Sequence, residues 1–237
     1  VIMVMIFAIA PIWVYPIFLM KVMCFALFAS AFNLLLGFGG LLSFGHAMFM
    51  GSAGYVAAYS AKAWGFNPEW CVLLGTAAST VLALVVGLLA IRRQGIYFAM
   101  ITLALAQMVF FFCLQAPFTG GEDGIQAVPR GKLFSLFDLE DNFNMYLFVL
   151  TIFLLGFLLI WRVVHSPFGQ ILKAIREHPD RATSLGYDTD TFKLLAFVIS
   201  GALAGTSGAT KSLVFQLASL TDVHWSMSGE VVLMTLV

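Results

Sequence analysis

Long uncharged apolar stretches follow one another along almost the whole chain, for example LFVLTIFLLGFLLI over residues 147–160. About 20 apolar helical residues cross the hydrocarbon core of a bilayer, where every backbone polar group must be satisfied within its own segment. The composition agrees, because 61% of the residues are hydrophobic and only 10% are charged, an imbalance that a water-soluble fold does not tolerate. The sequence therefore predicts an all-α, polytopic integral membrane helical bundle.

One transmembrane domain is expected to occupy residues 1–237, with about seven to eight spans in this fragment. The predicted spans are 1–15, 22–37, 41–61, 70–91, 95–116, 143–161, 194–215 and 226–237. The first residue is Val1 rather than methionine, and the chain stops at Val237 inside an apolar run. We therefore expect a piece of a longer gene product, truncated at both ends.

Basic residues indicate the side of the membrane on which each loop lies. Arg92 and Arg93 form one turn, and the loop 162–193 holds five more lysines and arginines. The loop 117–142 is mainly acidic. Because lysine and arginine are enriched in cytoplasmic loops, the first two segments are predicted to be cytoplasmic and the third external. The same alternation places Lys21 outside, which is mildly discordant.

Several chemistries lack their sequence signatures. Cys24, Cys71 and Cys113 are irregularly spaced in apolar surroundings, which favours buried thiols over a metal site. The formal net charge is zero and no basic run occurs, which disfavours a nucleic-acid partner. The chain has no P-loop of the form GxxxxGK[ST]. We expect a non-enzymatic chain that binds no metal or cofactor of its own.

The segment 33–55, NLLLGFGGLLSFGHAMFMGSAGY, combines glycines with polar side chains at membrane depth. Transporters use interrupted helices of this kind to line a path, although small residues also serve helix packing alone. A broken or re-entrant helix between 37 and 55 is an open alternative to a full span. A hydrolytic Ser/His pair is disfavoured because no third residue orients the histidine. The candidate path residues here are Asn33, Ser43, His46, Ser52 and Tyr55.

Other polar side chains at membrane depth add candidates for the same path. Span 95–116 carries Tyr97, Thr102 and Gln107, which do not share one narrow face and can equally form interhelical hydrogen bonds. Glu230 lies inside the last apolar segment, where either an ion pair or a path-lining role would explain a carboxylate.

The loop 162–193 contains a predicted amphipathic helix. Ser166 and Pro167 read as an N-cap and a first helical residue, and a second short stretch ends at Gly186. The apolar stripe recurs at i, i+3, i+4 and i+7: Phe168, Ile171, Leu172 and Ile175, with Arg176 and Glu177 on the other face. Such a stripe can dock on its own bundle, on lipid headgroups or in a groove of a cytoplasmic partner.

Several ordered motifs resemble branched-chain amino acid ABC permeases. They are 33–55, 94–104 (QGIYFAMITLA), 119–124 (TGGEDG), 166–177 (SPFGQILKAIRE) and 193–200 (KLLAFVIS). Together they extend from residue 33 to residue 200 at family-like separations. Within this family the chain looks like the larger of two related permeases. Its segment 180–182, Asp-Arg-Ala, departs from the Glu-Ala-Ala of the wider coupling pattern.

The resemblance implies a multi-pass subunit of the bacterial inner membrane that moves leucine, isoleucine or valine. It implies a heterodimer with a second permease, two cytoplasmic ATPases that carry the ATP and Mg, and a periplasmic binding protein. By the same resemblance, residues 166–186 form the coupling helix, with contacts from Phe168, Ile171, Leu172, Ile175, Arg176, Glu177 and Gly186. The alternatives are a permease for urea or short amides, or a stand-alone channel for a small polar solute.

Overall fold

The structure is a computed structural model that describes residues 15–93, 95–133 and 137–236. The predicted span 1–15 lies outside these residues, apart from its last position. The long helices are α2 (Pro16–Asn33), α3 (His46–Ala63), α4 (Pro68–Ala90), α5 (Ile96–Gln115), α6 (Asn142–Val164), α9 (Thr189–Phe215) and α10 (Trp225–Leu236). A π-helix, η2 (Leu34–Phe38), continues α2 directly, and the shorter helices α7 (Pro167–Glu177) and α8 (Pro179–Ser184) lie between α6 and α9.

Short turns and strands complete the chain. Between α5 and α6 lie the 3-10 turns η3 (Pro117–Thr119) and η4 (Gly121–Asp123) and the strands β1 (Ile125–Gln126), β2 (Lys132–Leu133) and β3 (Phe137–Asp138). Strand β4 (Leu217–Ala218) and the turn η5 (Leu220–Asp222) connect α9 to α10. The strands β1 and β4 pair antiparallel, as do β2 and β3. The pairing of β1 with β4 ties the α5–α6 loop to the end of α9.

Five of the described helices are long and apolar enough to cross a membrane: α2 with η2, α4, α5, α6 and α9. This confirms the helical membrane class, although the predicted count of seven to eight spans is not established. The predicted span 22–37 starts earlier, at Pro16, because proline at the first helical turn needs no backbone partner. Lys21 therefore lies within α2 rather than in the loop before it.

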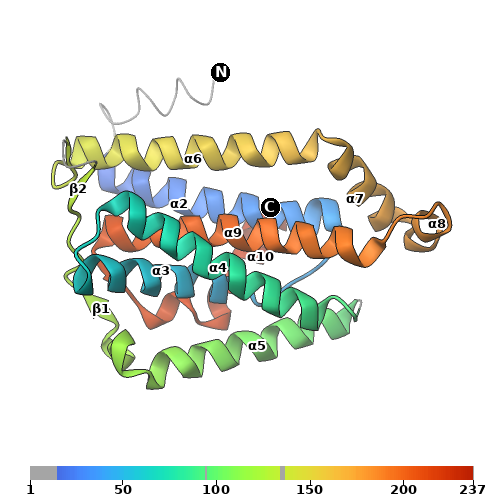
Figure 1. Cartoon of the computed structure of the whole chain (residues 1–237), viewed down its shortest axis with the longest axis horizontal. Coiled ribbons are helices and arrows are strands. Elements are labelled where there is room, and N and C mark those ends of the chain that lie inside the picture. Colours follow the sequence, from blue (N-terminus) through green and yellow to red (C-terminus); the bar gives the residue numbers. More distant parts are fainter. Residues whose placement is uncertain (1–14, 94, 134–136, 237) are drawn as a thin grey trace.

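The helices run side by side as a bundle in which α5 and α6 form opposite flanks (Figure 1). Helix α9 packs against α2, α3 and α4 in the interior, and its glycines allow the close approach that membrane helices use. A methyl group on Gly201 or Gly205 would meet Ala83 or Ser79 of α4. By contrast, α4 and α6 carry exposed apolar side chains such as Leu88 and Leu158, which suit contact with lipid.

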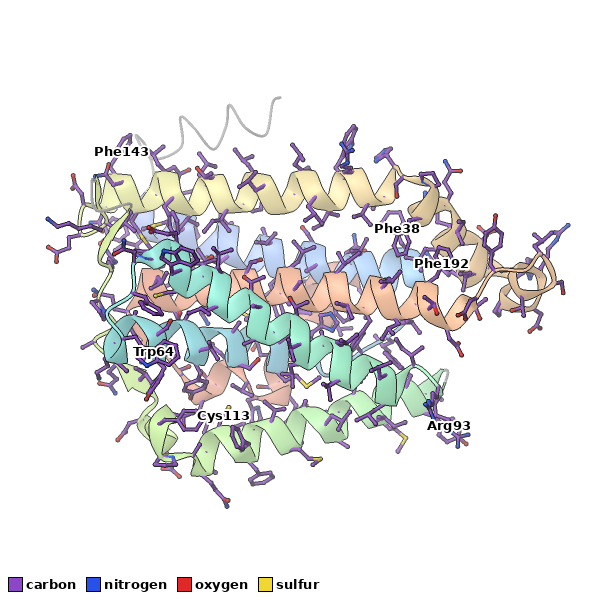
Figure 2. The ribbon with its side chains drawn as sticks, in the orientation of Figure 1. Phe38, Trp64, Arg93, Cys113, Phe143 and Phe192 are labelled. Atoms are coloured by element: carbon purple, nitrogen blue, oxygen red, sulfur yellow. The ribbon has the colours of Figure 1, made fainter. Side chains whose placement is uncertain are left out.

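The two ends of the bundle differ in charge and in content. The α4–α5 turn with Arg93 and the start of α9 with Phe192 lie at one end, whereas Trp64 and Phe143 lie at the other (Figure 2). We call the first the basic end; it also carries α7 and α8 (Figure 1). The loops 162–193 and 117–142 thus lie at opposite ends, as the Lys/Arg count predicts. Which end is cytoplasmic remains a prediction.

Candidate functional site

The chain between α2 and α3 is interrupted inside the bundle. The π-helix η2 runs to Phe38, the backbone of 40–45 is not helical, and α3 begins only at His46. Gly40 has φ +65°, a conformation that suits glycine and ends the helix. The predicted span 41–61 is therefore wrong in its first turn, while the alternative of a broken helix in this segment describes the structure.

His46 joins three elements at the point where α3 begins. Its Nε2 lies 2.8 Å from Ser200 Oγ of α9, and that hydroxyl donates to the Ala31 carbonyl of α2 at 2.5 Å. Because the Ser200 proton is used in this way, Nε2–H must be the donor to Ser200. The imidazole is fully buried and packs edge-on against the rings of Phe32, Phe49 and Phe197. This geometry suits a structural clamp.

The remaining polar candidates of segment 33–55 do not gather around the histidine. Ser43 Oγ accepts from the Gly45 amide at 3.3 Å and shares no hydrogen bond with His46 within the described chain. Ser52 donates to the Phe49 carbonyl at 3.3 Å. Ser52 and Tyr55 line a largely apolar pocket of about 410 Å³ between α3, α4 and α5. The structure thus divides these candidates among different surroundings.

The candidates on α5 also occupy different environments. Thr102 is buried and donates to the Ala99 carbonyl at 2.9 Å. Tyr97 is largely exposed, and Gln107 is half-buried on the outer part of the bundle. Their place in a path stays a prediction.

A cavity of about 630 Å³ opens at the basic end between α2, η2, α7 and α10. Asn33 is the one sequence-predicted path residue that lines it, together with Arg176. Lys193 of α9 and Thr235 of α10 complete its polar lining. We call this space the basic-end cavity. Two cationic side chains give it a positive character.

A second hollow of about 910 Å³ lies further along the same two helices, α2 and α10. Glu230 lines it, and so do three charged residues that were not among the predicted path residues: Lys21, Lys211 and Asp222. Lys211 Nζ lies 2.5 Å from Asp222 Oδ1 and 5.0 Å from the centre of the Phe25 ring. We call this hollow the α2–α10 groove. The sequence signal that would have identified these three residues is the recurrence of charged side chains close to the ends of neighbouring spans.

Much of the apolar stripe of α7 packs against the helical bundle of the same chain. Leu172 and Ile175 are buried, and Leu172 lies against Gly39. The Arg176 guanidinium donates to the Gly37 carbonyl of η2, and Lys173 Nζ lies 5.1 Å from the centre of the Phe38 ring. The first of the three docking alternatives, the chain's own bundle, therefore applies to this part of the stripe.

Phe168 is also used within the chain, because its ring stacks on Phe192 of α9 at 5.6 Å. The side of α7 that remains free forms a shallow groove of about 310 Å³ with α8. Its lining includes Ile171, Glu177, Leu185 and Tyr187, and Leu185 is 72% exposed. We call this the α7–α8 groove. Gly186 turns the chain beside it with φ +89°.

These features define a class of protein: a multi-pass helical membrane protein with an interrupted helix, hollows between helices, and the amphipathic helix α7 followed by a short second helix outside the spans. The chain belongs to the branched-chain amino acid transport system permease family, whose profile matches residues 15–237.

Individual relatives agree with the family. LivM, the high-affinity branched-chain amino acid transport system permease protein of Salmonella typhimurium, is 28% identical over 209 residues, which are 78% of this chain and 49% of the relative. LivM of Escherichia coli is 27% identical over the same share of each chain. The probable permease LivH of Methanocaldococcus jannaschii is 32% identical over 37% of this chain and 27% of its own. This chain spans about half the length of LivM. No solved structure matches it.

Proposed function

We propose that the chain is a permease subunit of a bacterial inner-membrane ABC importer for branched-chain amino acids, with its basic end in the cytoplasm. One observation carries the proposal beyond the family: α7 is bonded to the interrupted end of α2, while its free side forms a groove with α8. A helix pair of this kind can receive a partner on one side and transmit its movement on the other.

The partners follow from the family and from the printed names of the relatives. LivM and LivH are both permease proteins of branched-chain amino acid transport, which supports a pair of related permeases. Two cytoplasmic ATPases would hold ATP and Mg and supply the energy. A periplasmic binding protein would deliver leucine, isoleucine or valine. Urea and short amides are the alternative substrates, because the delivering protein largely sets selectivity.

Arg176 gives the proposed coupling a physical route. It was predicted to contact an ATPase, yet its guanidinium is directed at the Gly37 carbonyl within η2. A π-helix uses i→i+5 hydrogen bonds in place of the regular pattern and frequently occurs at functional sites. Movement of α7 would therefore pull on the end of α2, where Asn33 borders the basic-end cavity.

The ATPase contact is assigned to the α7–α8 groove rather than to the whole predicted stripe. Leu185 and Tyr187 are exposed beside Ile171; tyrosine is among the residues enriched at interface hot spots, and an exposed apolar patch marks an interaction site. Leu172 and Ile175 are already covered by the chain's own bundle. Ile171, Glu177 and Gly186 remain in reach of a partner.

The first experiment is co-purification of the full-length protein from its native operon in mild detergent. Two ATPases and a second permease should remain bound, and Leu185→Glu should release the ATPases. Ile96→Glu is the matched control, because Ile96 is an exposed apolar residue at the same end of the bundle but outside the groove. A homo-oligomer that conducts solute without ATPases would refute the proposal in favour of a channel.

The Arg176 link has its own test in reconstituted vesicles. Arg176→Gln should keep ATP hydrolysis but lower the leucine transported per ATP, because the stroke no longer reaches η2. Arg93→Gln is the control, since Arg93 is an exposed arginine at the same end of the bundle that lines neither the basic-end cavity nor the α7–α8 groove. An unchanged ratio of transport to hydrolysis in Arg176→Gln would remove this residue from the coupling route.

A further inference from the structure

The α2–α10 groove carries charge where a lipid-facing surface should have none. Lys21 and Glu230 line it and are both exposed. Within the described residues neither side chain has an ion-pair or hydrogen-bond partner. Its walls are otherwise mainly apolar, with Phe18, Phe215 and Met227 among them. The groove therefore presents two free charges of opposite sign in apolar surroundings.

Hydrogen bonds between helices give the depth of Glu230. Ser200, near the middle of α9, is bonded to His46, and the next residue, Ala47, donates its amide to Ser228 Oγ at 2.9 Å. Glu230 lies only two positions after Ser228, so its carboxylate lies at mid-bundle depth. A charged side chain at that depth facing lipid is costly and by default indicates a functional site.

The depth of Lys21 follows in the same way. Ser207 of α9 donates to the Cys24 carbonyl at 2.7 Å, which places the start of α2 beside the end of α9. Lys21 therefore lies at the level of the Lys211–Asp222 ion pair, away from the basic end. The two free charges are thus separated along α2 and α10, with the apolar walls between them.

The basic-end cavity lies next to the α2–α10 groove along the same two helices. Asn33 and Thr235 line it on α2 and α10, whereas Ala29 and Met234, which precede them by four residues and by one residue, line the groove. The two hollows are therefore consecutive along one pair of helices. We call them together the α2–α10 seam.

We propose that the α2–α10 seam is the wall of the solute path, and that its groove holds an amino acid zwitterion with an aliphatic side chain. Glu230 would face the ammonium group of the bound solute and the apolar walls its side chain, while Lys21, near the other end of the groove, would attract the carboxylate as the solute enters. A groove of about 910 Å³ is within the size range of small-molecule sites. This inference rests on the proposed transport function and locates its substrate.

Cysteine accessibility tests the proposal in vesicles that contain the full-length chain with its operon partners. The natural cysteines are buried, so they provide a silent background. Ala29→Cys should react with a charged, membrane-impermeant methanethiosulfonate reagent. Leu155→Cys is the matched control, because both positions lie thirteen residues after the first residue of their helices and Leu155 is 62% exposed on the apolar face of α6. It should stay unreactive.

Leucine should protect the seam. At a leucine concentration that fills half of the sites, labelling of Ala29→Cys should slow about twofold. Glu230→Gln should raise the concentration needed for this protection about tenfold, because a charge-assisted hydrogen bond to the ammonium group is lost. Equal reactivity of Ala29→Cys and Leu155→Cys, or protection unchanged by Glu230→Gln, would overturn the proposal.

The outcomes also separate this inference from the proposed function. ATP-driven leucine uptake together with an unreactive Ala29→Cys would support the importer function but refute the seam as a path, because lipid or another chain would then cover it. Leucine-protected labelling in a protein that associates with no ATPase would keep the seam as a path and refute the importer.

Discussion

Replacing Gly208 by alanine should force α3 and α9 apart. A methyl group there would overlap the carbonyl group of Met50, whose carbon lies 2.6 Å from the added atom. The obstacle is backbone, which cannot rotate away as a side chain does. Overpacking of this kind costs about 1–3 kcal/mol, and a glycine-to-alanine change in a helix returns roughly 0.5–1 kcal/mol. A net loss of about 1–2 kcal/mol in the free energy of unfolding is expected.

Gly54, on the facing side of the same contact, is the matched control. Its added methyl group would lie 3.4 Å from the Gly208 carbonyl oxygen, close to ordinary contact, so Gly54→Ala should be nearly neutral. Gly229→Ala in α10 meets nothing within 4 Å and should be neutral or slightly stabilising. Unfolding titrated with SDS in mixed micelles measures all three variants. Equal stability of Gly208→Ala and Gly54→Ala would refute the close approach of α3 and α9.

Three further changes test separate contacts in the same unfolding assay. Ser200→Ala should cost about 1–3 kcal/mol, because His46 Nε2 then loses its buried partner, and a neutral result would contradict the clamp. Asp222→Asn should cost about 1–2 kcal/mol, since Lys211 then keeps a partly buried charge without its counter-ion; Asp123→Asn, at an exposed acid nearby, is the control. At the start of α9, hydrogen bonds from Thr191 hold the pKa of Asp188 below its usual value. The carboxylate therefore stabilises the helix at pH values above its ordinary pKa. This stabilisation is lost as the pH falls through the lowered pKa. Asp188→Asn should lack that acid-side loss, and an unchanged pH profile would show that the cap contributes nothing.

Local patterns in the chain were enough to predict the class of fold and most of its helices. Apolar stretches such as 147–160 have one stable form in a bilayer, a helix with its backbone bonds internal. The same reasoning predicted the amphipathic helix that became α7, from Pro167 and the spacing of its apolar residues. These features depend on neighbours within a few positions, so they can be derived without knowledge of the tertiary structure.

Helix boundaries near glycine and proline were less predictable. Helix α2 begins at Pro16, before Lys21. The turn at Gly40 interrupts the helix, and α3 begins only at His46. Either residue type is compatible with a turn or with a helix terminus, and the packing of neighbouring helices selects between them. The sequence therefore indicated that a helix is interrupted between 37 and 55, but not at which residues it ends and begins again.

What the sequence determined by itself is a multi-pass helical membrane protein of the branched-chain amino acid permease family, because hydrophobicity, helix periodicity and ordered motifs are local properties. Only the tertiary structure decided which polar groups meet. It closed His46 into a clamp with Ser200, turned Arg176 toward Gly37, and aligned Glu230 with Lys21 along one seam. Such meetings depend on how distant helices pack, and packing is set by side-chain shape across the whole bundle rather than by spacing along the chain.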